Sequence, residues 1–468
     1  MLDFTGSYTD QYQIAMGQVF FSKRQTSKKA TFDYFFRKLP FNGGYAVFAG
    51  LENILEILEN FKFSEADLEF LKSLNLDEKY LEYLKDFKFR GNIYSMREGE
   101  LVFPSEPILR VEANIIEAQI IETFLLNILN FQTLIATKAS RMAIQAKGKT
   151  LIDFGLRRAQ GPGGYYASRA AVIGGFDASS NTRAGRDFNI PVSGTMAHSF
   201  IQSYENELQA FRDFAEVHPE NSVLLVDTYD TLKSGVPNAI LVGKEMEEKG
   251  QRLKGIRLDS GDLAYLARKS RQLLDEAGLN YVKIAVSNQL DEHLIKSLLD
   301  QEAPIDIFGV GTNLVTGHPD AALDGVYKLA FFDGKPNIKL SETIKKVTLP
   351  HKKEVHRILD SEGNFSGADI ITMAGEKVFE MMHHISDPLK FLSLNGRNTE
   401  IILEKVMENG KRTTAPKTLD EIKNFSYQRL KKLPPEYKRF FNPHIYKVGI
   451  SEDLKQSRDS ILKAHKMN

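Results

Sequence analysis

The feature that most constrains the fold is a recurrence of short apolar runs between about residues 148 and 312. Each run is followed by small and polar residues and then by a helical pattern. This alternation is typical of parallel strands joined by helices, and buried parallel strands read as continuous apolar runs. The runs are KTLIDF (149–154), AAVIGGFD (170–177), NIPVSG (189–194), SVLLVDT (222–228), LKGIRLDSG (253–261), VKIAVSN (282–288) and DIFGVGT (306–312).

The segments between these runs include two amphipathic helices, expected at 239–252 and 262–279. A barrel or partial barrel fits the pattern better than a doubly wound sheet, because no GxGxxG opens a helix after the first strand. We therefore expect an irregular, TIM-like α/β barrel domain over residues 146–335 that carries the active site.

The flanking segments have a different texture. Residues 1–145 mix strand and helix patterns, with an aromatic strand at 31–41 and a core-facing helical pattern at 115–131, and predict an N-terminal α+β domain. Residues 336–468 are rich in charge and predict a peripheral C-terminal segment of helices and a few strands that packs on the first two domains.

Composition excludes several classes of function. The 468 residues contain 61 Lys and Arg against 61 Asp and Glu, so no excess of positive charge marks a nucleic-acid or anionic-membrane binder. The absence of cysteine excludes disulfides, thiolate nucleophiles and cysteine-based zinc sites. The N-terminal sequence lacks the basic and apolar regions of a signal peptide, and polar residues interrupt the apolar stretch 115–131. We expect a soluble, cytoplasmic protein that binds neither nucleic acid nor membrane.

Reactive and anion-binding residue types gather at the ends of the expected strands. In a βα barrel the carboxyl ends of all strands face one pocket. Seven such clusters are therefore better explained by one active site than by seven unrelated turns. The clusters are Asp153 with Arg157 and Arg158, Ser179-Ser180-Asn181, Thr195 with His198, Asp227 with Asp230, Arg257 with Asp259 and Asp262, Ser287-Asn288, and Gly309-Val310-Gly311-Thr312.

These residue types suit a phosphate-bearing substrate. The guanidinium groups of Arg157 and Arg257 can bind carboxylates and phosphates through paired hydrogen bonds. The GVGT turn (309–312) can direct successive N–H groups at a phosphate. Carboxylates beside such anion sites indicate a Mg²⁺ ion that lies between them and a polyphosphate.

The motifs also resemble a known family. FFRKLPF, DFGLRRAQGP, IGGFDASSNTRAG, PVSGTMAHSF, DTYDT, GIRLDSGDL, GVGTNLVT and GVYKL occur in the order found in nicotinate phosphoribosyltransferases, members of the type II phosphoribosyltransferases. TDQYQ near the start and KLPPEYKRFFNPHIYKVGIS near the end are similar to that family as well. The resemblance covers nearly the whole chain.

The resemblance implies an activity in NAD salvage. A nicotinate phosphoribosyltransferase transfers phosphoribose from 5-phosphoribosyl 1-pyrophosphate to the ring nitrogen of nicotinate and releases pyrophosphate, with ATP as co-substrate and Mg²⁺ as cofactor. The resemblance further implies that ATP phosphorylates His198 during turnover. It also implies a homodimer with shared active sites, in which Asp10 and Tyr12 enter the pocket of the neighbouring subunit.

The resemblance gives the remaining candidates individual roles. Arg257 matches a contact to the pyridine ring and the phosphates, and Asp227 and Asp259 match residues near Mg²⁺ and pyrophosphate. Phe154 or Leu156 would supply an apolar face for the pyridine ring. Catalytic roles are thus expected for His198, Arg257 and Asp259. The expected substrate contacts are Asp10, Tyr12, Phe154, Leu156, Arg157, Ser180, Thr195, Asp227, Gly309, Gly311 and Thr312, and the expected metal ligands are Asp227 and Asp259.

Three other functions stay open on the sequence. Nicotinamide phosphoribosyltransferase shares the architecture, but its members carry an aspartate where this chain has Ser180, which favours nicotinate as substrate. A phosphate-binding barrel lyase or isomerase would use His198 as a general base. A barrel that only binds a nucleotide would release no pyrophosphate.

Overall fold

The chain divides into two compact units in the computed structural model, which describes residues 4–340 and 347–466. Unit 1 comprises residues 1–137 and 322–468, and unit 2 comprises Lys138–Ala321. The first and last segments of the sequence thus belong to the same unit. The domain boundaries at 145 and 335 stay a prediction from the sequence. Part of the charge-rich stretch after residue 335, at 341–346, lies outside the described residues.

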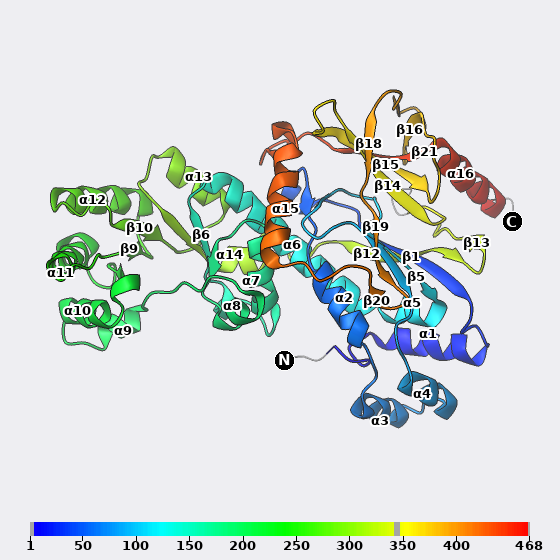
Figure 1. The fold of residues 1–468 in the computed structure, drawn as a ribbon, viewed down its shortest axis with the longest axis horizontal. Coiled ribbons are helices and arrows are strands. Elements are labelled where there is room, and N and C mark those ends of the chain that lie inside the picture. The colour runs from blue at the N-terminus through cyan, green and yellow to red at the C-terminus, as the bar shows by residue number, and fades with distance from the viewer. Residues whose placement is uncertain (1–3, 341–346, 467–468) are drawn as a thin grey trace. The chain divides into compact units, whose positions relative to one another are not determined.

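Unit 2 is a βα array with one parallel sheet (Figure 1). Its strands are β6 (Thr150–Asp153), β7 (Ala178–Ser179), β8 (Val223–Leu225), β9 (Gly255–Leu258), β10 (Lys283–Val286) and β11 (Ile307–Val310). Its α-helices are α7 (Gly163–Ile173), α8 (Thr182–Phe188), α9 (His198–Gln202), α10 (Glu207–Val217), α11 (Val236–Glu248), α12 (Leu263–Glu276), α13 (Glu292–Asp300) and α14 (Thr312–Val315). Short helical turns occur at Leu156–Arg158, Pro219–Asn221 and Thr231–Gly235.

The six strands run in the order β7-β6-β11-β10-β9-β8, and every pairing is parallel. The predicted barrel-like α/β domain is therefore confirmed, in the form of a sheet with β7 and β8 at its edges. Figure 1 shows α12 beside β9 and β10, with α11 beside α12 and α10 beside α11. The two helices expected between strands are α11 and α12. Asp262 caps α12 by accepting a hydrogen bond from Tyr265 N at 3.0 Å.

Two of the expected strands are largely wrong. In the run 170–177 the residues up to Ile173 belong to α7, and only Ala178–Ser179 pairs as β7. The run 189–194 contributes one isolated bridge, between Ser179 and Val192. A short apolar run can be a buried helix segment as well as a strand, and alanines and Ile173 give α7 its buried face.

The described residues of unit 1 form a seven-stranded sheet, a six-stranded sheet and a small sheet of two strands. Its strands are β1 (Lys29–Phe36), β2 (Ala46–Val47), β3 (Asn92–Ser95), β4 (Leu101–Val102), β5 (Leu109–Asn114), β12 (Gly325–Phe332), β13 (Lys335–Pro336), β14 (Lys353–Leu359), β15 (Phe365–Met373), β16 (Met381–His384), β17 (Phe391–Ser393), β18 (Asn398–Ile401), β19 (Glu404–Glu408), β20 (Lys411–Arg412) and β21 (Lys447–Ser451). Its helices are α1 (Gln11–Ser22), α2 (Leu51–Asn60), α3 (Glu65–Ser73), α4 (Glu78–Lys85), α5 (Ile115–Ile120), α15 (Leu419–Lys432) and α16 (Glu452–Lys466), with short turns at Pro40–Asn42 and Pro435–Lys438. Helix α6 (Glu122–Ala146) begins in unit 1 and ends in unit 2.

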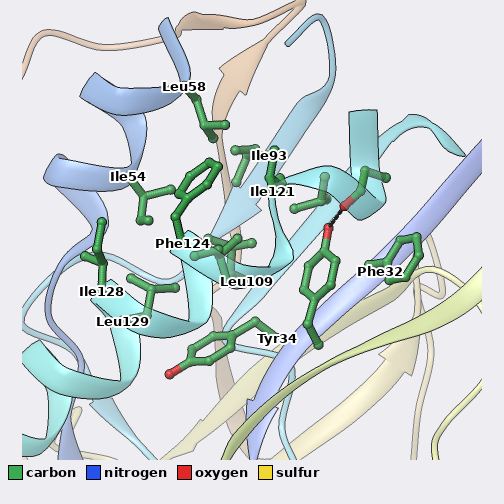
Figure 2. Close-up of a cluster of buried hydrophobic side chains, with 14 of the residues drawn as sticks. Phe32, Tyr34, Ile54, Leu58, Ile93, Leu109, Ile121, Phe124, Ile128 and Leu129 are labelled. Atoms are coloured by element: carbon green, nitrogen blue, oxygen red, sulfur yellow. Dashed lines mark hydrogen bonds between the residues drawn. The ribbon is translucent and has the colours of Figure 1, made fainter. Parts of the chain in front are cut away.

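The helical pattern at 115–131 becomes α5 and the first part of α6, and it supplies much of the core of unit 1. Phe124, Ile128 and Leu129 of α6 lie against Ile54 and Leu58 of α2, as Figure 2 shows. Each of these side chains is at most 3 % exposed, so the apolar positions of the pattern face the core as predicted.

A buried ion cluster ties the two halves of unit 1 together. Arg357 of β14 is fully buried and pairs with Glu100, from the first half of the sequence, and with Asp369 of β15 at 2.8 Å. Arg429 of α15 pairs with the same Glu100 at 2.8 Å. Buried charges require such partners, because an unpaired one is costly to desolvate. The C-terminal segment therefore shares a polar core with the N-terminal segment, and it also forms a six-stranded sheet of its own.

Candidate active site

The carboxyl ends of the parallel strands of unit 2 lie at one edge of the sheet. Asp153, the last residue of β6, pairs with Ser179 of β7 on one side and with Val310 of β11 on the other. Leu258, the last residue of β9, pairs with Val286 of β10. The candidates at this edge are Phe154, Leu156, Arg157, Ser180, Asp227, Arg257, Asp259, Gly309, Gly311 and Thr312. The loop before α9 adds Thr195, and the first residue of α9 adds His198.

Arg257 lies at the centre of these residues. Its Nη1 donates to Thr195 Oγ1 at 2.6 Å, and its guanidinium lies 6.0 Å from the centre of the Phe154 ring. Burial lowers the pKa of Arg257, while the carboxylates of Asp259 and Asp227 act in the opposite direction. Its Nε is buried and makes no hydrogen bond within the described part of the chain. An unpaired buried N–H of this kind suits an anionic or carbonyl ligand.

Phe154 is held in a narrow slot beside Arg257. A Cβ at Gly309 would come within 2.3 Å of the Phe154 ring, so only a glycine lets the ring lie against β11. The Phe154 backbone N–H donates to Val310 O at 2.7 Å and fixes the start of the loop. Of the two residues proposed to face a ring, Phe154 is thus the one beside Arg257, whereas Leu156 is 43 % exposed and lies against Gly164.

The two aspartates adjoin each other. Asp227 Oδ2 accepts hydrogen bonds from the backbone N–H of Asp259 at 2.8 Å and from Ser260 Oγ at 2.6 Å. Asp259 Oδ1 in turn accepts a hydrogen bond from Ser287 Oγ. Asp227 Oδ1 is buried and has no partner among the described residues. One carboxylate oxygen is therefore oriented by the protein and the other is free for a ligand.

This arrangement fits Mg²⁺. Within residues 4–340 and 347–466 no group of three or more His, Asp or Glu side chains forms a complete metal site. Mg²⁺ is commonly held by only one or two carboxylates, with substrate phosphates and water completing its coordination. The free oxygen of Asp227, next to Asp259, offers such a partial ligand set.

His198, the first residue of α9, extends toward the aspartates. Its Nδ1 lies 3.1 Å from Thr228 Oγ1, and its Nε2 lies 3.8 Å from Asp259 Oδ2. The side chain is 38 % exposed, so solvent or a ligand can reach the ring. His198 is therefore anchored on one side by a hydroxyl group and faces a carboxylate on the other.

Ser180 follows the edge strand β7, and the glycine turn follows β11, which lies between β6 and β10. The Ser180 backbone N–H donates to Asp153 O at 2.8 Å, while its half-buried hydroxyl makes no hydrogen bond within the described residues. Gly311 precedes the short helix α14, and Thr312 is its first residue and is half-buried. Arg157 is exposed in the turn after β6 and is close enough to lower the pKa of Arg257.

Asp10 and Tyr12 belong to unit 1. Asp10 precedes α1, and its Oδ2 accepts a hydrogen bond from Thr123 Oγ1 at 3.0 Å. Tyr12 is 48 % exposed, and the burial of its remaining surface together with Glu122 raises its pKa. The contribution of these two residues to an active site stays a prediction from the resemblance.

Three hydroxyl side chains escaped the sequence-based list of candidates. Thr228 and Ser260 each follow an expected site aspartate directly and hydrogen-bond to His198 and Asp227, respectively. Adjacency to an aspartate at a strand end is the signal that could have found them. Ser168 lies 2.7 Å from Asp153 but comes from the middle of α7, where no motif marks it.

Unit 1 contains a cavity of about 960 Å³ of its own. Cationic residues on its wall include Arg37, Lys38 and Lys328. Among the described residues on that wall, the one carboxylate is Asp33, and the buried Lys353 pairs with it at 2.7 Å. The cavity therefore has an excess of positive charge and would attract an anion.

Comparison with known proteins agrees with the geometry. The model of the nicotinate phosphoribosyltransferase (NAPRTase) family matches residues 150–379, and the models of the N-terminal and C-terminal domains of these enzymes match residues 8–130 and 352–458. No described helix is long and apolar enough to cross a membrane.

Individual relatives cover almost the entire chain. The nicotinate phosphoribosyltransferase of Bacillus subtilis is 47 % identical over 95 % of this chain and 93 % of its own length. The enzyme of the same name from Rattus norvegicus is 33 % identical over 97 % and 96 %. The crystal structure of human nicotinic acid phosphoribosyltransferase superposes with a TM-score of 0.86 at 30 % identity and covers 97 % of this chain and 99 % of that one. The chain therefore belongs to the nicotinate phosphoribosyltransferase family and is an enzyme of that type.

Proposed function

We propose that the chain transfers phosphoribose from 5-phosphoribosyl 1-pyrophosphate to nicotinate and couples this transfer to ATP hydrolysis. The bond between the anomeric carbon and the pyrophosphate oxygen breaks, and the pyridine nitrogen forms the new bond, giving nicotinate mononucleotide and pyrophosphate. The observation that carries the proposal is the position of Arg257. Its guanidinium lies beside the Phe154 ring, and the carboxylates of Asp259 and Asp227 favour its positive charge. A guanidinium group can lie against a flat ring and donate hydrogen bonds to a phosphate at the same time.

The transfer needs positioning and charge stabilisation rather than a protein nucleophile. As the anomeric carbon becomes oxocarbenium-like, negative charge moves onto the leaving pyrophosphate. The buried, unpaired Nε of Arg257 would donate to that charge or to the pyridine carboxylate. Asp227 and Asp259 would hold Mg²⁺, which neutralises pyrophosphate charge when bound. The Phe154 ring would pack against the pyridine ring and keep its nitrogen directed at the sugar.

His198 would serve the coupling to ATP. A neutral imidazole nitrogen can attack the γ-phosphorus of ATP, so that ADP leaves and a phosphohistidine forms, which water later hydrolyses to free phosphate. The hydrogen bond between Thr228 Oγ1 and His198 Nδ1 orients the ring. The side chain is 38 % exposed, so a ligand can reach it. The phosphorylated ring would lie next to Asp259 and change the charge of the pyrophosphate site.

One assay tests the proposed function. Purified protein is mixed with Mg²⁺, phosphoribosyl pyrophosphate and either nicotinate or nicotinamide, with and without ATP, and the mononucleotide is measured by mass spectrometry. We expect nicotinate mononucleotide in greater amount with ATP. Formation of the nicotinamide product alone would assign the chain to the other substrate. Absence of both products would remove the proposed activity.

The choice of nicotinate over nicotinamide rests on Ser180. Its free hydroxyl can donate to a carboxylate without a charge penalty, whereas an aspartate there would repel a carboxylate and accept from an amide. We expect Ser180→Asp to lower kcat/KM for nicotinate far more than for nicotinamide, measured with both bases at saturating phosphoribosyl pyrophosphate. Ser297→Asp adds the same charge to an exposed position of α13 and should change neither value. An equal loss for the two bases would mean that Ser180 only shapes a turn.

We further propose a cytoplasmic homodimer in which Asp10 and Tyr12 complete the site of the neighbouring subunit. In support, Tyr12 is 48 % exposed on α1, so its side chain is free to contact a second copy. The two chains would be related by a twofold axis, the commonest symmetry of soluble oligomers.

Mixing two variants that lack the ATP-stimulated activity tests this arrangement. Tyr12→Ala and His198→Ala place their defects in different units, so a mixed dimer with shared sites has one intact site and one site with both defects. After unfolding and refolding together, the mixture should recover up to about a quarter of the parental ATP-stimulated activity. Each variant refolded alone is the control. A mixture no more active than its components would place Tyr12 and His198 of one chain in the same site.

A further inference from the structure

Asp153 is buried at the end of β6, directly before Phe154, and is 1 % exposed. Its carboxylate makes three short contacts. Oδ2 accepts hydrogen bonds from Ser168 Oγ at 2.7 Å and from Ser179 Oγ at 2.8 Å, and Oδ1 accepts from the Gly155 N–H at 2.8 Å. No cation pairs with it within the described residues. Burial raises its pKa, and the three hydrogen bonds oppose that rise.

These contacts connect the two loops that carry the proposed nicotinate contacts. Gly155 follows Phe154, and Ser179 precedes Ser180. The Ser180 N–H also donates to the backbone oxygen of Asp153 at 2.8 Å. A single residue thus binds the loop of the ring-packing Phe154 on one side and the loop of Ser180 on the other.

The surroundings leave these loops little freedom. A Cβ at Gly155 would lie 2.1 Å from a methyl group of Val315, so this turn packs tightly against α14. Ser168 reaches the same carboxylate from α7, and Asn181 Nδ2 lies 3.3 Å from Ser168 Oγ. A displacement of the Asp153 carboxylate would therefore change the spacing between Phe154 and Ser180.

We propose that Asp153 is a positioning residue for nicotinate, which sets the spacing between the Phe154 ring and the Ser180 hydroxyl through Ser168, Ser179 and Gly155. The proposal rests on the proposed function, because it takes Phe154 and Ser180 as the contacts to the base. The charge of Asp153 explains the number of its partners, since a buried carboxylate needs several donors. An apolar residue would fill the same space but could not accept from both loops.

The test is a split between the kinetic constants of the two substrates. In Asp153→Asn one acceptor oxygen becomes an N–H donor that faces either the Gly155 N–H or the two serine hydroxyls. We expect KM for nicotinate to rise about tenfold, while KM for phosphoribosyl pyrophosphate and kcat change by less than about threefold. Ser179→Ala keeps the carboxylate, removes one donor and should give a smaller shift in the same direction. This variant also serves if Asp153→Asn fails to fold.

Ser222→Ala is the matched control. Ser222 is fully buried, and its hydroxyl donates to His218 O at 2.7 Å at the amino end of β8, away from the strand ends that carry the site. It should lower thermal stability as much as Ser179→Ala does and leave KM for nicotinate unchanged. If Ser179→Ala raises both KM values together or neither, Asp153 only stabilises the fold. Failure of the parental protein to form nicotinate mononucleotide would instead contradict the proposed function.

Discussion

Replacing Arg257 by lysine should lower kcat/KM for nicotinate about a hundredfold, a loss of roughly 3 kcal/mol of transition-state stabilisation. A lysine keeps the positive charge but cannot bind Thr195, lie beside Phe154 and present a further N–H to a ligand at once. The buried Nε of Arg257 has no partner among the described residues, so its hydrogen bond is available to the substrate. Steady-state kinetics with varied nicotinate and phosphoribosyl pyrophosphate measure the effect.

The pattern of constants separates this role from simple charge attraction. If the Arg257 guanidinium acts mainly in the transition state, kcat falls as much as kcat/KM, whereas the loss of contacts made equally in the ground state would raise KM alone. Arg252→Lys is the matched control, because Arg252 is exposed before β9 and lies 5.0 Å from the Tyr281 ring. Its activity should equal that of the parent. Near-parental kinetics of Arg257→Lys would contradict a role for the Arg257 guanidinium group in the transition state.

Much of the array in unit 2 could be predicted because its strands are short and buried on both faces. The runs at 149–154, 222–228, 253–261, 282–288 and 306–312 each contain the strand that the structure shows. Such runs carry a strong apolar signal, and polar residues mark where each one ends.

The prediction of strands from the sequence failed where an apolar run is a buried part of a helix. The segment 170–177 has the composition of a strand, but its first residues complete α7. Similarly, the order β7-β6-β11-β10-β9-β8 depends on pairings between distant segments, which local patterns do not contain. The buried cluster of Arg357, Glu100 and Asp369 was equally out of reach, because its members lie far apart in the sequence and no spacing relates them.

The candidate site could be predicted residue by residue but not in its connections. Polar strand ends indicated Arg257, Asp227 and Asp259, and the structure brings them together. The hydrogen bonds that orient them come from hydroxyl groups such as Ser260, and small hydroxyl residues are too common in turns to be singled out by type. Only the fold shows which of them reach a carboxylate.

His198→Ala should abolish ATP hydrolysis and the stimulation of nicotinate mononucleotide formation by ATP. The slow, ATP-independent transfer should remain at the parental ATP-free rate, because Arg257, Asp227 and Asp259 serve the sugar chemistry and are unchanged. Alanine removes the nitrogen that would attack the γ-phosphorus, and no other described histidine is hydrogen-bonded to Thr228 beside Asp259. Release of ADP and formation of the mononucleotide are followed in the same reaction, with and without ATP.

The control for this variant is His218→Gln, in the same unit, where the histidine is exposed and packs beside Phe214. It should retain both ATP hydrolysis and ATP stimulation.

A second measurement detects the phosphoenzyme directly. The parental protein incubated with γ-labelled ATP should carry an acid-labile, base-stable label, as expected for phosphohistidine, and His198→Ala should carry none. Parental ATP hydrolysis by His198→Ala would assign the phosphoryl acceptor to another group. Loss of the ATP-independent transfer as well would mean that His198 takes part in the sugar chemistry, since the coupling step alone cannot account for that loss.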